Sequence, residues 1–287
     1  MSFWVAIIVS ACGGDGKTLP TDNSSLYYLF AQQKEPVPVL TPTSTPTPTS
    51  TPTPTVSPDS EPESETTPDL VPTPVKTFAE AQKGDEVEFG RYPQTKVEGS
   101  DPVEWQIQPI KWLVLSRDEE NKQLLAISLT GLDVHRFDDN SNVWGSSEIR
   151  GWLNGDGFYN KIFEDGRAVF TNDEKSFIKP VVLSDVYMTE SLYMTEEDNV
   201  FLLSNGEANA YFADDSARMC KPTDYAVANG AWVETSGSYA GNSVWWLRSP
   251  NLDYANNVYD VINNGRINYY FFYDNGIVVR PALWIKL

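Results

Sequence analysis

The chain has 287 residues, in which 40 acidic side chains outnumber 21 basic ones and leave a formal net charge of −19. A chain this acidic cannot neutralise a phosphate backbone, so its composition argues against a nucleic-acid partner. Two cysteines and one histidine are too few for a disulfide framework or for a zinc site built from Cys and His. Nine Trp and fourteen Tyr indicate an aromatic core, an aromatic recognition surface, or both.

Residues 1–12 are a short apolar run that ends in Val9-Ser10-Ala11-Cys12. This ending resembles the lipobox of bacterial lipoproteins, in which small residues precede a cysteine that is lipidated and becomes the first residue of the mature chain. The run is too short to span a bilayer as a helix. We therefore expect a lipoprotein signal peptide with lipid attached to Cys12, so that the protein is anchored to a membrane without crossing it. The alternative is an ordinary buried apolar segment.

Residues 13–76 have the composition of a linker. From Thr41 to Pro58 the sequence alternates Thr or Ser with Pro, and an acidic stretch follows. Proline at alternate positions forbids a helix and favours extended polyproline II, and nothing in the segment can build a core. We predict a disordered Thr/Pro-rich stalk whose Thr41–Pro74 part reaches on the order of 100 Å.

Residues 77–287 contain the signals of one α+β domain with a mixed or antiparallel sheet. Strands are predicted at Glu86–Tyr92 (closed by Pro93), Pro109–Leu115, Leu124–Leu129, Val200–Leu203, Trp245–Leu247 and Ile277–Leu287. Helices are predicted at Ser146–Leu153, Ile162–Phe177 and Asn205–Phe212. The pairs Asn264-Gly265 and Asn275-Gly276 predict tight turns with a positive φ.

Catalytic and metal-binding motifs are weak. His135 is flanked by apolar residues and Cys220 has no partner nearby in the sequence, so no catalytic residue is assigned. The Asp138–Asn142 loop offers oxygen ligands for calcium, but it lacks the EF-hand spacing and is more typical of a plain turn. No metal or cofactor is expected, and calcium at this loop stays an open alternative. Many acid pairs exist for glycoside hydrolysis, and no one pair stands out.

The segment Asn251–Asn275 carries seven Asn and five Tyr. Antibody paratopes use similar residues, because Tyr gives a large contact area with few torsions and Asn gives adaptable hydrogen bonds. Turn formation alone would explain only some of the Asn residues. If Ile267 and Val258 point inward, strand alternation turns their neighbours outward. The predicted ligand-binding residues are Asn251, Asp253, Tyr254, Asn256, Asn257, Tyr259, Asn268, Tyr270, Phe272 and Tyr273.

Six short motifs follow one another in a familiar order. They are Gly90–Pro93, Ile110–Leu115, Ser146–Asn154, Val200–Ser204, Trp246–Pro250 and Val279–Leu283. In this order they resemble the bacterial domain of unknown function 6273 and, more distantly, the variable proteins of diversity-generating retroelements, such as the treponemal variable lipoprotein. The resemblance implies a C-type lectin-like fold of the formylglycine-generating-enzyme subclass, in which the two ends of the domain pair in one sheet and C-terminal hairpins display the ligand-binding residues.

The same resemblance divides the C-terminal segment into scaffold and variable positions. It implies that Trp246, Arg248, Arg280 and Pro281 are scaffold and that the residues between them vary, since retroelement mutagenesis converts Asn codons into Tyr, Asp, Phe and Ser codons. Formylglycine-generating activity is not implied, because the cysteine pair that it requires is missing and Cys220 stands alone.

Together these features predict a lipid-anchored protein of the bacterial cell surface that binds a protein or glycan and is not an enzyme. The alternatives are an envelope enzyme acting on glycan or peptidoglycan, which needs an acid pair converging in a pocket, and a purely structural envelope protein.

Overall fold

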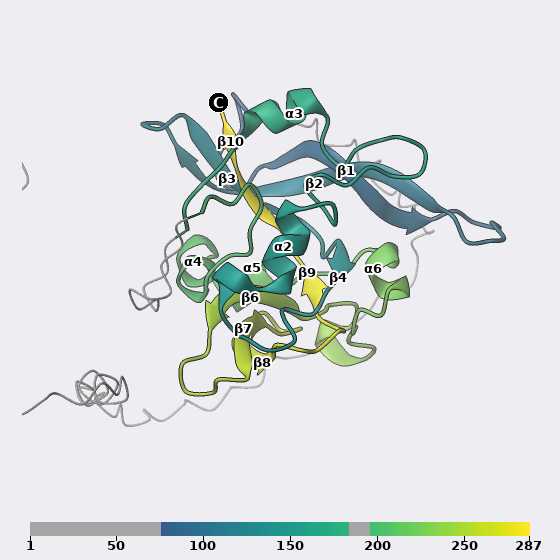
Figure 1. Cartoon of the computed structure of the whole chain (residues 1–287), viewed down its shortest axis with the longest axis vertical. Helices are drawn as coiled ribbons and strands as arrows, with labels where there is room; N and C mark the ends of the chain where they lie inside the picture. Colours follow the sequence, from purple (N-terminus) through teal and green to yellow (C-terminus); the bar gives the residue numbers. More distant parts are fainter. Residues whose placement is uncertain (1–75, 184–195) are drawn as a thin grey trace, which may run out of the picture. The chain divides into compact units, whose positions relative to one another are not determined.

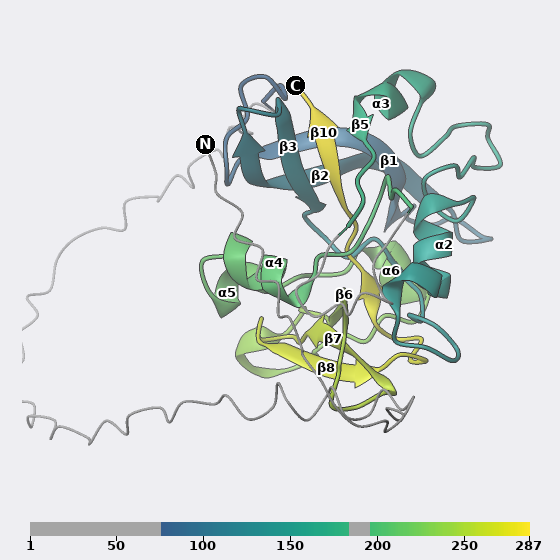
Figure 2. The ribbon, with the colours of Figure 1, turned by 60° about the vertical axis from the view of Figure 1, so that its left-hand side comes forward.

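A computed structural model describes residues 76–183 and 196–287. The predicted signal peptide with Cys12, and the predicted linker up to residue 75, lie outside the described residues. The described chain is α+β, as predicted, and most of its regular structure is strand, arranged in two five-stranded sheets. Short helices lie between and beside the two sheets (Figures 1 and 2).

The first sheet has the strand order β1-β2-β3-β10-β5 and is antiparallel throughout. Its strands are β1 (Glu86–Lys96), β2 (Trp105–Asp118), β3 (Gln123–Ser128), β10 (Ala282–Lys286) and β5 (Ile178–Lys179). Every residue of β3 is buried, which its run of apolar side chains favours. The two ends of the domain both enter this sheet, although β2 and β3 separate β1 from β10.

The prediction that Pro93 ends the first strand is wrong, because β1 continues to Lys96. The register of β1 against β2 shifts between Glu88 and Arg91 and again between Pro93 and Thr95. β1 is also the edge strand of its sheet and has a neighbouring strand on one side only. A proline is tolerated in an edge strand, because its missing backbone N–H need not deprive a neighbouring strand of a hydrogen bond.

The second sheet has the order β4-β9-β6-β7-β8 and contains one parallel pair, β6 with β9. Its strands are β4 (Asp133–Val134), β9 (Val278–Val279), β6 (Trp245–Pro250), β7 (Asn257–Val261) and β8 (Ile267–Phe271). The predicted continuous strand Ile277–Leu287 is wrong, because β9 and β10 belong to different sheets. Pro281 lacks an N–H and restricts the residue before it, which favours a bend at this point.

Two of the three predicted helices are confirmed. Helix α2 (Glu148–Asn154) begins at Ser147, whose side chain accepts the N–H of Arg150, and α4 (Asn205–Tyr211) begins with a capping box. The predicted helix Ile162–Phe177 is wrong over most of its length. Only α3 (Asn172–Phe177) is helical, and Ile162 instead forms an isolated bridge with Ala168.

The predicted strand Val200–Leu203 is a buried segment with one bridge, Phe201 to Ala282. The remaining helices, for which no prediction was made, are α5 (Asp215–Arg218), α6 (Asp224–Ala228) and the 3-10 turns η1 (Trp144–Ser146) and η3 (Gly237–Tyr239). Within residues 76–183 and 196–287, no helix has the length and apolar composition needed to cross a membrane.

Arg280 lies where the chain passes from the second sheet to the first, and its side chain is buried. Its Nε donates to the carbonyl of Ser128 at the end of β3 (2.8 Å), and Nη1 donates to the carbonyl of Arg218 (3.3 Å). The guanidinium carbon lies 4.9 Å from the ring centroid of Trp245 in β6. Burial lowers the pKa of Arg280. The side chain thus contacts both sheets.

Replacing Arg280 with Met keeps most of the side-chain volume and removes two hydrogen bonds and two cation–π contacts, with Trp245 and with Phe212. We expect a loss of about 2–4 kcal/mol in the free energy of unfolding, measured by urea denaturation. Arg266→Met is the matched control, because Arg266 is exposed on the β7–β8 connection. It should change the free energy by less than about 0.5 kcal/mol. Equal effects of the two variants would contradict a joining role for Arg280.

Candidate ligand-binding site

Strands β7 and β8 form the hairpin that was predicted to bind ligand, and β8 is the edge of its sheet. Five residue pairs hold its register, from Asn257 opposite Phe271 to Val261 opposite Ile267. Alternate residues therefore point to opposite faces of the hairpin.

The turn of this hairpin is fixed by Gly265, which has a φ of +84°. A Cβ there would lie 1.6 Å from the carbonyl oxygen of Asp215, so only glycine fits. Arg218 in α5 donates from Nε to the Gly265 carbonyl (2.9 Å). The predicted Asn264-Gly265 turn is confirmed, whereas Asn275-Gly276 has no positive φ and the prediction there is wrong.

One face of the hairpin carries a row of aromatic side chains, which we call the aromatic face. Tyr254 stacks on Tyr269 with ring centroids 5.3 Å apart, and Phe271 stacks on Tyr273 at the same distance. Tyr259 meets Tyr269 edge to face. Tyr254 is 55% exposed and Tyr273 is 49% exposed. The rings are therefore ordered by one another while much of their surface stays in solvent.

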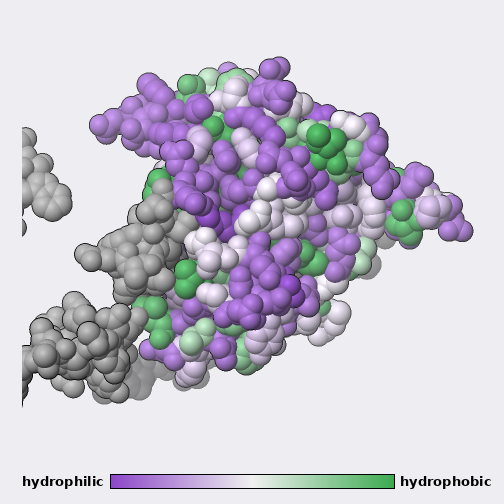
Figure 3. Space-filling view, viewed as in Figure 1, coloured by the Kyte–Doolittle hydropathy of each residue, from purple (hydrophilic) through white to green (hydrophobic). Residues whose placement is uncertain are grey.

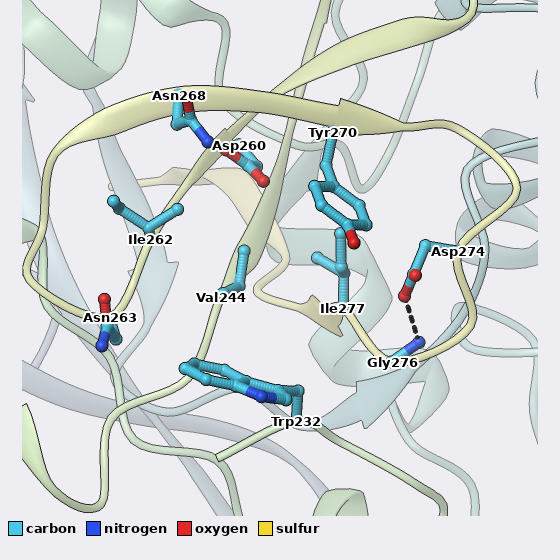
Figure 4. A pocket seen from close by; sticks show the side chains of 10 residues that line it. All are labelled: Trp232, Val244, Asp260, Ile262, Asn263, Asn268, Tyr270, Asp274, Gly276 and Ile277. Carbon is cyan, nitrogen blue, oxygen red and sulfur yellow. Dashed lines mark hydrogen bonds between the residues drawn. The ribbon is translucent and has the colours of Figure 1, made fainter. Parts of the chain in front are cut away.

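The opposite face of the hairpin closes one side of a cavity of about 310 Å³, which we call the hairpin pocket (Figure 4). Its lining residues are Trp232, Val244, Asp260, Ile262, Asn263, Asn268, Tyr270, Asp274, Gly276 and Ile277. Asp260 and Asn268 are paired across the two strands, and Tyr270 follows on the same face. Apolar side chains from outside the hairpin form much of the other wall.

Asp260 is the unusual residue of the hairpin pocket. It is fully buried, and neither carboxylate oxygen has a hydrogen-bond partner among the described residues. Burial away from water raises the pKa of Asp260 to about 7. The other acid of the pocket, Asp274, accepts the N–H of Gly276 at 2.7 Å. No Lys, Arg or His is among the described residues that line the cavity.

The structure divides the ten predicted ligand-binding residues into exposed, half-buried and buried groups. Those that are exposed are Asp253, Tyr254, Asn256, Asn268, Tyr270 and Tyr273, and Tyr259 is half-buried. They do not form one surface: Tyr254, Tyr259 and Tyr273 belong to the aromatic face. Asn268 and Tyr270 share one face, as predicted, and that face lines the hairpin pocket.

Three of the predicted residues, Asn251, Asn257 and Phe272, are buried, so their expected exposure is wrong. The side chain of Asn251 accepts the N–H groups of Asp253 and Tyr254 at 2.9 and 3.1 Å, which makes it part of a turn. Asn257 opens β7, and its carbonyl accepts the N–H of Asn251. Phe272 follows the end of β8, where the chain turns and strand alternation no longer applies.

Among the residues that sequence reasoning missed are Tyr269 and Phe271 on the aromatic face, and Trp232 and Asp260 in the hairpin pocket. A signal existed for Asp260, because an acid between Tyr259 and Val261 in a strand of buried residues needs an explanation. Trp232 comes from a loop distant in sequence, and no local pattern indicates its position.

The other candidate residues have structural contacts. The ring of His135 lies 5.4 Å from that of Trp152. The Asp138 carboxylate accepts backbone N–H groups from Asn140, Ser141 and Glu148, at 2.7, 2.9 and 3.1 Å. In the described part of the chain, no three His, Cys, Asp or Glu side chains converge as metal ligands. Burial raises the pKa of Cys220, which disfavours a reactive thiolate.

The raised pKa of Asp260 predicts a pH-dependent stability. Between its unfolded pKa near 3.8 and its folded pKa of about 7, the folded state binds more protons, so this residue lowers the free energy of unfolding as pH rises. The full effect is roughly 4 kcal/mol, at about 1.36 kcal/mol per pKa unit. Asp260→Asn should therefore gain stability over the wild type between pH 4 and 8, measured by urea denaturation.

Asp156→Asn is the control for this measurement, since Asp156 is exposed and does not line the pocket. Its difference from the wild type should stay flat with pH. Parallel curves for the wild type and Asp260→Asn would contradict the raised pKa.

Comparison with known proteins gives one match. A family model described as "Domain of unknown function (DUF6273)" matches residues 111–287, which is more than half of the chain. No curated protein and no solved structure matches. The matched range begins within β2 and includes both faces of the hairpin, whereas β1 and the motif Gly90–Pro93 precede it. The chain therefore belongs to the DUF6273 family.

Proposed function

We propose that this domain binds a protein or glycan ligand through the aromatic face of the β7–β8 hairpin. The observation that carries the proposal is the row of stacked, exposed rings on and beside the edge strand β8. Exposed clusters of large apolar side chains are typical of interaction sites, and Tyr is enriched in them because it combines a large apolar area with a polar hydroxyl.

The stacking also supports binding on energetic grounds. Tyr254 and Tyr269 differ by 25° in ring plane, and Phe271 and Tyr273 by 12°. Rings that are already held in one orientation lose little conformational entropy when a ligand contacts them. Flat rings can cover the apolar face of a sugar or pack against protein side chains. The view in Figure 3 shows a mostly hydrophilic surface with scattered apolar patches.

We also propose that the domain has the fold of the subclass named above and that it is related to the variable proteins of diversity-generating retroelements. The entry of both ends of the described domain into one sheet, and a C-terminal hairpin with two accessible faces, support a C-type lectin-like fold of the formylglycine-generating-enzyme subclass. The burial of Trp246, Arg248 and Arg280 supports their role as scaffold. A nearby reverse-transcriptase gene with an imperfect repeat of the DNA that encodes residues 251–275 would support diversification.

The same proposal places the protein at the bacterial cell surface. Lipid on Cys12 would anchor it to the membrane, and the Thr/Pro-rich segment would carry the domain away from the bilayer. Radiolabelled palmitate that is incorporated into the wild type and absent from Cys12→Ala tests the anchor.

One observation favours a second function, that of an envelope enzyme acting on glycan or peptidoglycan. Asp260 and Asp274 line the same cavity, and a carboxyl with a pKa near 7 suits a general acid. Release of reducing sugar from purified peptidoglycan that is lost in Asp260→Asn would support this alternative over a binding module.

The double variant Tyr254→Ala/Tyr269→Ala removes one stacked pair from the aromatic face. We expect its binding to a glycan array and to a surface-protein array to fall at least tenfold below that of the wild type. Because both rings are partly exposed, the melting temperature should change by no more than about 2–4 °C.

The matched control is Tyr239→Ala, which truncates an exposed Tyr in η3 that is not part of the aromatic face. Its binding should equal that of the wild type. Unfolding of the double variant would mean that the rings serve the core, and a wild type that binds neither array would favour a structural envelope protein.

A further inference from the structure

The hairpin pocket lies on the side of β7–β8 opposite the aromatic face, and the proposed binding of ligand by the aromatic rings does not use it. Figure 4 shows Asp260, Asn268 and Tyr270 reaching from the two strands into the space above Trp232, with Val244 and Ile277 between. The kind of ligand that would fit the pocket therefore depends on the charge and polarity of its own lining residues.

The first indication is the carboxylate of Asp260. A buried acid normally keeps its charge only when hydrogen-bond donors or a cation compensate it. Here both oxygens lack a partner among the described residues, and no described lining residue is a cation. A positively charged group entering the pocket would supply what the protein itself does not.

The second indication is the nature of the walls. Val244, Ile262 and Ile277 give the cavity apolar sides. A hydrated metal ion does not suit them, and the carboxylate of the other acid, Asp274, already accepts a backbone N–H. An organic cation on an aliphatic stem fits both parts, since its stem can contact the apolar walls while its head meets the carboxylate.

Aromatic rings give a third indication. Trp232 and Tyr270 both line the cavity, and each can present a ring to a cation. The volume of about 310 Å³ falls in the range of small-ligand sites. An extended basic side chain can therefore enter with its head near Asp260.

Entry requires local movement, because the side chain of Asp260 is not exposed to solvent. Asn268 is paired with Asp260 across the hairpin, Tyr270 follows on the same face, and both are exposed side chains on the edge strand. Exposed side chains change rotamer in picoseconds to nanoseconds. Rotation of these two side chains therefore offers a route from solvent to the carboxylate that leaves the strands in place.

We propose that the hairpin pocket binds the ammonium or guanidinium group of a lysine or arginine side chain from a partner protein, with Asp260 as its counter-ion. The net charge of −19 favours a basic partner surface during encounter. The apolar walls favour the aliphatic stem of a side chain over the hydroxylated ring of an amino sugar. This site and the aromatic face can act independently.

The test titrates the full chain with the methylamides of N-acetyl-lysine and N-acetyl-arginine and follows the indole N–H signal of Trp232 by NMR. We expect saturable shifts with at least one of the two, and at least tenfold weaker binding of N-acetyl-norleucine methylamide, which has the stem without the charge. Asp260→Asn should weaken binding of the cationic probe at least tenfold, and Asp156→Asn should leave it unchanged.

A second variant, Trp232→Ala, tests the aromatic wall, with the shifts of the Asn268 side-chain amide as the readout. Trp232 is 47% exposed, so the domain should still fold, and binding should weaken about fivefold. The proposal is overturned if neither cationic probe binds, if the neutral probe binds as well as they do, or if Asp260→Asn binds like the wild type. Stronger binding of glucosamine than of both side-chain probes would also overturn it.

Discussion

The domain depends on a single buried guanidinium where its last strands change sheet. Arg280 follows β9 and precedes β10, which belong to different sheets, and its side chain contacts both of them. It donates to the carbonyl of Ser128 at the end of β3 and lies over the ring of Trp245 in β6. Burying a charge is unfavourable in itself, and here carbonyl dipoles and an aromatic ring compensate for the loss of water.

Two other buried arginines are used in the same way. Arg218 donates to the carbonyl of Gly265 at the hairpin turn, and Arg248 donates to the carbonyl of Leu202 and pairs with Glu207. In a fold with short helices and long connections, many backbone carbonyls have no partner in a strand or helix. Long side chains with several N–H donors can reach such carbonyls from a distant part of the chain. Arg218 holds the hairpin turn in place in this way.

Features set by neighbouring residues could be predicted from the sequence. Ser147 and Ser204 begin helices as their capping patterns indicate, and Asn264-Gly265 makes the turn of the hairpin. Features that depend on distant partners could not. The segment Ile277–Leu287 is divided between two sheets because β9 pairs with β6 and β10 pairs with β3. Both partner strands are distant in sequence, so local patterns do not indicate the division. Phe272 lies beyond the end of β8, so strand alternation wrongly predicted that its side chain is exposed.

The candidate site shows the same limit. An Asn- and Tyr-rich hairpin was visible in the composition, but its division into an aromatic face and a pocket depends on the pairing of Tyr259 with Tyr269 and of Asp260 with Asn268. The wall that makes a cavity out of the second face comes from Trp232, which lies about 30 residues earlier in the chain.

The two strands of the hairpin also differ in how they can evolve. Four of the five residues of β7 are buried, whereas four of the five in β8 are exposed, and β8 pairs with a neighbour on one side only. Substitutions in β8 therefore disturb few packed contacts, while those in β7 disturb the core. New side chains can accumulate on the outer strand of this hairpin with little cost to folding, and the inner strand keeps the register that presents them.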